Sequence, residues 1–280
     1  MLSGDDDLDT AGVPERADDR QGDDMTAHPW DTGLTLAFDS SVEEYFAPDI
    51  EAYCDILLGR IMPIFNEADS VYREASAAYK ARFSGIPNLP IEIEEQAHEH
   101  ASITAMQFAE MRDVFIAVGV SGLFHLFEKQ VYRHLNRDFE RHGIGSICHW
   151  DHAKHVIDRF THRYEDHEIV ECAALVSALQ NTDLQELESL ANSVKHGTNG
   201  RSFRALIKSD SPVVAGPRDG DDISPQTILK VDLTITSQDV LRYKAAIIAF
   251  WSVEGEFWTP YGSVVEAKNT KKAKKPGAGS

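Results

Sequence analysis

Apolar residues recur three and four positions apart along most of the chain after residue 41, which is the spacing of amphipathic helices. We expect Pro63 to kink the first helix, since proline cannot donate the helical hydrogen bond. Thr182, with Gln185 three residues later, and Ser237 are the expected N-caps of the last two helices. The helices predicted in this way cover residues 42–84, 91–141, 149–163, 168–180, 182–196 and 237–258.

Two segments depart from the helical pattern. Residues 208–227 are rich in Pro, Gly and Asp and predict a loop. Residues 228–236 alternate apolar and polar side chains, which predicts a short strand. The fold class is therefore all-α, a helical bundle with a small extended insert near the C-terminal helix. The 91–141 and 182–196 helices should pack together, because neither can bury its apolar stripe alone.

Composition and charge divide the chain into three parts. Its 280 residues are 42% apolar and carry a net charge of −19, with nine acidic residues and two arginines among the first 24. We expect an acidic disordered tail over 1–30, one helical domain over 31–265 and a basic flexible tail over 266–280. The acidic domain argues against a broad basic surface, so contact with RNA would need a local cationic site.

Neither a membrane span nor a basic–apolar signal peptide is evident, and the three cysteines are far apart. These features favour a cytoplasmic protein that does not contact membranes. His149, His152 and His155 recur every three residues, which could suit a metal, but a solvated polar helix face is the favoured interpretation. We therefore expect no metal and no cofactor; a metal protein built on this cluster is the weakest of the three function classes.

The best candidate for chemistry is the segment 190–200, LANSVKHGTNG. Asn192 and His196 are four residues apart and share one helix side, and Lys195 lies at its edge. Histidine can transfer a proton near neutral pH, an amide can orient a hydroxyl or water, and lysine can neutralise phosphate. The alternative is an ordinary helix C-terminus, where the dipole favours Lys and His.

Glu128 is the second candidate. It lies at the edge of the apolar stripe of Phe124, Phe127, Val131 and Leu135, so its carboxylate should be partly buried and need a partner. His125 or Tyr132 could provide it on the same helix, and Asn192, Lys195 or His196 from another. The alternative is a side chain that bends out to water.

These segments carry a family resemblance. The succession of LFHLFEKQVYRHL (123–135), ELESLANSVKHGTNGRS (186–202) and LRYKAAIIAFW (241–251) resembles HEPN-like bacterial proteins. The resemblance implies an all-α, usually dimeric protein, often a metal-independent endoribonuclease of toxin–antitoxin or phage-defence systems. The family motif is Arg, four to six residues, then His, often with Asn after the Arg. Asn192 and His196 match its second half, and Ala191 occupies the Arg position.

By this resemblance His196 would be the acid–base group, Asn192 would orient the substrate, and Glu128 would hold the site together. Lys195, with Arg201 or Arg204, would bind phosphate, and an arginine restored at position 191 should raise activity. The expected partners are a second copy of the chain, RNA or a nucleotide, and a cognate antitoxin or defence-complex protein. The cleft should lie near the dimer axis. The alternative function is a non-catalytic sensor or adaptor that binds a nucleotide or a protein partner.

Overall fold

The computed structural model describes residues 33–86, 88–160, 162–165, 168–171, 174–197, 200–215, 232–260 and 262–264. This part of the chain is mostly helical, as predicted, and belongs to one compact unit. The expected tails, 1–30 and 266–280, lie outside the described residues, as does most of the predicted loop and strand between 208 and 236.

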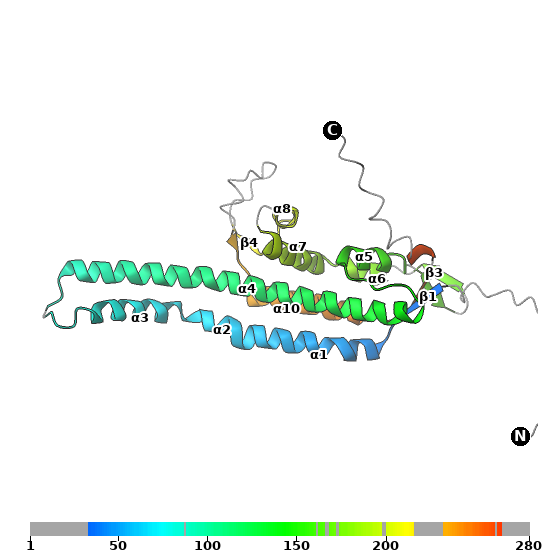
Figure 1. Cartoon of the computed structure of the whole chain (residues 1–280), viewed down its shortest axis with the longest axis horizontal. Helices are drawn as coiled ribbons and strands as arrows, with labels where there is room; N and C mark the ends of the chain where they lie inside the picture. The colour runs from blue at the N-terminus through cyan, green and yellow to red at the C-terminus, as the bar shows by residue number, and fades with distance from the viewer. Residues whose placement is uncertain are drawn as a thin grey trace, which may run out of the picture. The chain divides into compact units, whose positions relative to one another are not determined.

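The longest element is α4, Ile91–Arg141, whose bounds agree with the prediction. It begins after Pro90, and Gly143 follows its end with a φ of 68°, a conformation that favours glycine. Figure 1 shows the N-terminal helices lying alongside it. The predicted kink is confirmed: the helix breaks around Pro63 into α1 (Ser40–Ile56), a π-helical turn (Leu57–Ile61), α2 (Met62–Ile64), a 3-10 turn (Phe65–Glu67) and α3 (Ala68–Ala81).

Two further helices complete the bundle. α7, Thr182–His196, packs along α4 as predicted, and α10, Ser237–Trp251, packs against α1 and α7. Their caps differ by one residue from the prediction: Asn181 accepts hydrogen bonds from the first turn of α7, and Thr236 forms a capping box with Asp239. The short helices are α5 (Trp150–Ile157), α6 (Ala174–Leu179) and α8 (Arg201–Lys208), the last of which the sequence analysis missed.

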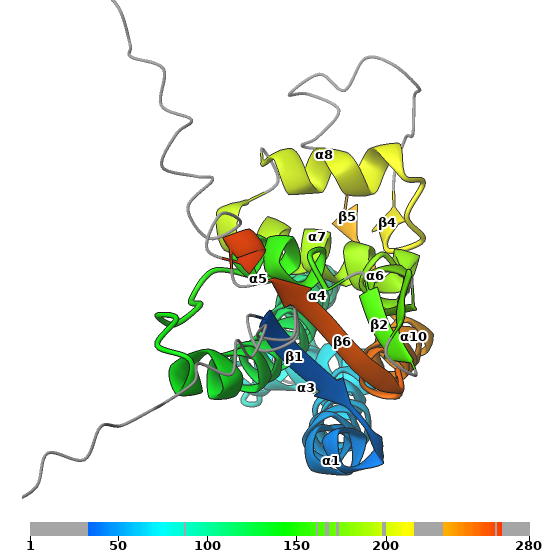
Figure 2. The same ribbon diagram turned by 90° about the vertical axis from the view of Figure 1, so that its right-hand side faces the viewer.

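A four-stranded antiparallel sheet was not predicted. Its order is β1-β6-β2-β3, formed by Gly33–Phe38, Gly255–Pro260, His162–Glu165 and Glu168–Glu171. Figure 2 shows β1, β6 and β2 of this sheet. The helices predicted over 149–163, 168–180 and 237–258 were therefore too long. The expected insert near the last helix is present as β4 (Val214–Ala215) paired with β5 (Asp232–Leu233). Pairing between Gly33 and Pro260 joins the two ends of the domain, which no local periodicity can reveal.

The sheet closes over an aromatic core. Phe38 of β1 packs edge-on against His134, Phe250 and Phe257, and Phe46 stacks on Trp251 at 4.4 Å between ring centroids. Gln130 is buried in α4; it donates to Phe46 O (3.0 Å) and accepts from Trp251 Nε1 (3.1 Å). These two bonds tie α1, α4 and α10 together and satisfy polar groups that burial would otherwise penalise.

One helix of the described residues, α4, is long and apolar enough to cross a membrane by length and composition. The sequence analysis overlooked this run, and half of its most apolar 18-residue window is buried within the protein. A helix that packs in the protein interior passes the same test, so this run alone does not identify a membrane span.

Candidate functional site

A cleft of about 660 Å³ opens between α4, the start of α5 and the C-terminal half of α7. Figure 1 shows α7 and α5 on the same side of α4. The residues that line it are Phe124, His125, Glu128 and Tyr132 of α4, Cys148, His149, Trp150 and Asp151 at α5, and Glu188, Asn192, Lys195 and His196 of α7.

The cleft brings together four of the six candidate residues. Glu128 comes from α4, whereas Asn192, Lys195 and His196 come from α7. Arg201 and Arg204, the expected phosphate ligands, are not among the residues that line the cleft; both are exposed on α8. Among the described residues that line this cleft, Lys195 is the one with a permanent positive charge.

The amphipathic pattern of α7 explains how its polar side chains reach the cleft. Leu184, Leu187, Leu190 and Ala191 are buried on one side, which turns Asn192, Lys195 and His196 the other way. Gly197 then ends the helix with a φ of 80°. Within the described part of the chain, the side chains of these three residues form no hydrogen bond or ion pair, so all three can engage a ligand.

Ala191 faces the core and not the cleft. Its side chain is 1% exposed, which leaves no space for a longer one. This burial argues against the expectation that an arginine at position 191 would restore the family site, because the guanidinium would have to enter the apolar interior.

Glu128 has both of the local partners that the sequence suggested. Tyr132 donates a hydrogen bond of 2.5 Å to Oε1, and His125 Nδ1 lies 3.1 Å from Oε2. Burial and the hydrogen bond to Glu128 raise the pKa of Tyr132, so its hydroxyl stays protonated. In the residues that the structure covers, Glu128 forms no bond to Asn192, Lys195 or His196. Its contacts therefore hold Tyr132 and His125 in place on α4.

The loop before α5 brings in residues that sequence reasoning missed. The Asn136 amide accepts from Ile147 N (2.7 Å) and donates to Ile147 O (2.9 Å), which fastens this loop to α4. Cys148 and His149 follow directly and line the cleft. Asn136 and Ile147 are not part of any recognisable sequence pattern, so sequence alone could not have placed His149 at the cleft.

The histidine cluster around α5 is divided between two surfaces. His149 lines the cleft, whereas His155 lines a separate depression against α6. Among the residues described here, no group of three or more His, Cys, Asp or Glu side chains is placed to hold a metal. The expectation that the chain needs no cofactor stays a prediction.

Carboxylates outnumber lysines around the cleft. Glu128, Asp151 and Glu188 supply carboxylates, and Lys195 is the lysine on the lining. Lys154, just behind, donates to Glu188 at 2.6 Å and lies 3.9 Å from Asp151. Three imidazoles, from His125, His149 and His196, also face this space.

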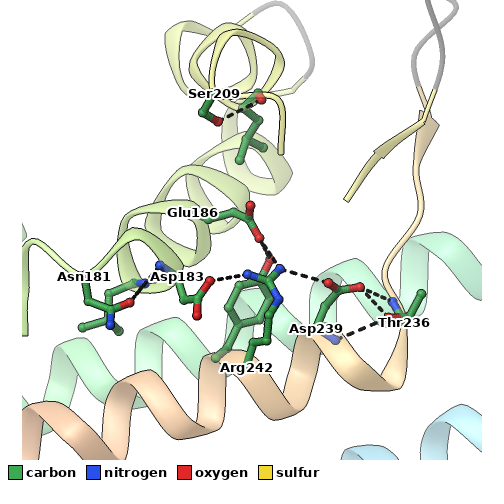
Figure 3. A network of polar contacts seen from close by, with 10 residues as sticks. Asn181, Asp183, Glu186, Ser209, Thr236, Asp239 and Arg242 are labelled. Carbon is green, nitrogen blue, oxygen red and sulfur yellow. Dashed lines mark hydrogen bonds and ion pairs between the residues drawn. The ribbon is translucent and has the colours of Figure 1, made fainter. Parts of the chain in front are cut away.

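A polar network fixes α7 against α10 (Figure 3). Arg242 pairs with Asp183, with Glu186 at 2.7 Å and with Asp239 at 2.9 Å. Tyr243 also donates to Glu186 at 2.6 Å. Burial alone would raise the pKa of Asp239, but hydrogen bonds from Thr236 and Arg242 outweigh it and lower that pKa. The network holds the start of the helix whose end carries Asn192 and His196.

Comparison with protein-family models, with curated proteins and with solved structures gave no match for this chain. The resemblance to HEPN-like proteins therefore stays a prediction, and the argument for function rests on the cleft.

Proposed function

We propose that the chain is a HEPN-like, metal-independent endoribonuclease whose active site is this cleft. The observation that carries the proposal is the convergence of His196, Asn192 and Lys195 with a second imidazole, His149, on one open cleft. Two imidazoles, an amide and an ammonium are sufficient for acid–base cleavage of a phosphodiester without a metal.

In the proposed reaction, neutral His196 takes the proton of a ribose 2′-hydroxyl, and the freed oxygen attacks the adjacent phosphorus. Protonated His149 gives its proton to the departing 5′-oxygen. Lys195 neutralises the non-bridging oxygens, and Asn192 orients the hydroxyl. The products are a 2′,3′-cyclic phosphate and a 5′-hydroxyl, so the phosphodiester is opened without a water molecule. Glu128 keeps Tyr132 and His125 in place at the rim.

The biological setting comes from the family resemblance. A cytoplasmic ribonuclease of a bacterial stress or phage-defence system would be kept inactive by a cognate antitoxin or a defence-complex protein. The cleft is open at its surface, so a bound partner could cover His196 and Lys195, both of which are exposed.

One observation favours a second function, a sensor or adaptor that binds a nucleotide without cleaving it. Three carboxylates line the cleft, and the residues that line it include no arginine among those described. Carboxylates accept hydrogen bonds from the amino groups of bases, whereas cleavage of a phosphodiester needs positive charge near the phosphate.

Incubation of the purified full-length chain with RNA in EDTA separates these functions. We expect cleavage that leaves cyclic phosphate ends, and a loss of about 100- to 10,000-fold for His196→Ala, as is typical when a general acid–base is removed. His155→Ala, on α5 but outside the cleft, is the matched control and should cleave normally. If wild type cleaves no RNA but binds a nucleotide that Asn192→Ala no longer binds, the chain is an adaptor.

A further inference from the structure

A row of large apolar side chains lies exposed on the first two thirds of α4. Ile103, Met106, Met111, Val114, Phe115 and Val118 are each 44–62% exposed. Six such residues within four to five turns of one helix are unusual for a solvated surface, where apolar side chains occur singly. This surface, here termed the α4 stripe, is therefore a candidate interface.

The α4 stripe is left open by the rest of the described chain. α3 packs against another side of this half of α4, where Ala97 and Ala101 are buried. Phe65 packs there too: its ring is tilted against Phe108 at 5.5 Å between centroids, and it stacks at 5.8 Å on Phe115, which lies at the edge of the stripe. Ile103, Val114 and Val118 recur at helical spacing on the face that remains, so one further helix could lie along them.

The order of residues along the stripe is nearly symmetric about the peptide bond between Glu110 and Met111. Ile103 and Val118 are equally distant from that point, and so are Gln107 and Val114. If two copies of α4 lie antiparallel about a two-fold axis there, Ile103 of each copy meets Val118 of the other. Met106 likewise meets Phe115, and Gln107 meets Val114, as an isologous interface requires; Met111 is the exception, because it meets Glu110.

Charge also favours this antiparallel pairing. Residues 91–113 hold six acidic side chains and one arginine, residues 114–124 hold none of either sign, and residues 125–141 hold three acidic and four basic ones. A parallel pair would set the two acidic halves side by side. The antiparallel pair sets residues 97–107 of each copy beside the uncharged residues 114–124 of the other, and residues 91–96 beside 125–130, which hold one glutamate and one lysine. This arrangement lowers the repulsion. The two Glu110 side chains near the axis are the one unfavourable pair.

We propose that a second copy of this chain binds the α4 stripe, as an antiparallel α4–α4 pair centred between Glu110 and Met111. The proposal is independent of the chemistry in the cleft. It differs from the sequence expectation that the cleft lies near the dimer axis, because His125 at the cleft rim lies about 22 Å along the helix from the proposed axis, at 1.5 Å per residue. The two clefts would thus face separate ligands.

The first measurement is the mass of the full-length chain in solution by light scattering. We expect twice 31.2 kDa for wild type. Val114→Glu should raise the dimer dissociation constant about 100-fold or more, because the dimer would bury two unpaired carboxylates. Leu241→Glu, at a residue 45% exposed on α10, is the matched control and should stay dimeric. A monomeric wild type, or a dimer that Val114→Glu leaves intact, overturns the proposal.

Cysteine cross-linking tests the register in a Cys148→Ser, Cys172→Ser background. Met111→Cys should form a disulfide-linked dimer by itself, since it lies beside the axis. Ile103→Cys and Val118→Cys should each fail alone and succeed when the two variants are mixed. A dimer linked through Ile103→Cys alone, or no cross-link at Met111→Cys, contradicts the antiparallel pairing. The substituted positions are exposed within a single copy, so the fold of each variant should not change.

Discussion

Tyr132 and Glu128 are joined by a hydrogen bond of 2.5 Å, one turn apart on the side of α4 that lines the cleft. The hydroxyl is the donor, because burial and the adjacent carboxylate keep it protonated and raise its pKa. The carboxylate is thus held by Tyr132 on one oxygen and by His125 on the other, which leaves it little freedom to act as a base.

This geometry predicts a positioning role for Glu128 and not a catalytic one. Tyr132→Phe removes one hydrogen bond and should lower the rate of RNA cleavage by about tenfold or less, at roughly 1 kcal/mol for one bond. Glu128→Gln can still accept the bond from Tyr132 and should behave similarly. The measurement is the single-turnover rate over a range of pH. Unchanged midpoints of the pH profile fit positioning, whereas a lost midpoint in Glu128→Gln would make the carboxylate the general base.

His134 predicts a dependence of stability on pH. It is buried among Phe38, Phe46 and Trp251, and burial lowers its pKa from 6.5 to about 4, with Arg137 adding to the effect and Asp138 and Asp39 opposing it. Below pH 6.5 the unfolded chain binds a proton at this imidazole, and the folded chain does not until about pH 4. Stability from this group is therefore full above pH 6.5 and is lost as the pH falls toward 4.

We expect the free energy of unfolding to fall by about 2 kcal/mol between pH 7 and pH 5 because of His134. Urea unfolding of wild type and His134→Phe at both pH values isolates it, because all other titrating groups are shared. A difference between the two proteins that is the same at pH 7 and pH 5 would show that His134 does not remain neutral in the fold.

An arginine at position 191 should destabilise the fold. The Ala191 side chain is 1% exposed, so Ala191→Arg would overpack the core between α4 and α7 and bury a charge. The expected loss in the free energy of unfolding is about 3 kcal/mol or more. Ala205→Arg, on the exposed side of α8, is the matched control and should change stability by less than about 0.5 kcal/mol. A stable Ala191→Arg with faster RNA cleavage would restore the family interpretation of this position.

Removal of Arg242 should weaken the attachment of α7 to α10. Arg242→Met leaves the carboxylates of Asp183, Glu186 and Asp239 close together without their cation. We expect a loss of about 2–4 kcal/mol in the free energy of unfolding, since the pairs are partly buried. The deficit should shrink at pH 5, where the released carboxylates bind protons more readily. Arg204→Met, exposed on α8, controls for the lost charge, and an equal loss there would argue against a special role for the network.

The local pattern of the sequence was sufficient for the helices and for part of the cleft. The apolar spacing placed α4 and α7 at their observed bounds, and the same spacing identified the polar side of α7 with Asn192, Lys195 and His196. The partners of Glu128 could also be predicted from the sequence, because His125 and Tyr132 are three and four residues away on the same helix. All of these relations lie within one helix, where the 3.6-residue repeat determines which side chains are neighbours.

Tertiary structure decided the rest. β1 and β6 pair across more than two hundred residues, so the strand at 255–260 looked like the end of a helix until its partner was known. His149 reaches the cleft only because Asn136 holds the preceding loop, and Ala191 faces the core because α4 covers that side of α7. Such relations depend on which distant segments bury each other's surface, and a periodic pattern within one segment carries no information about its partner.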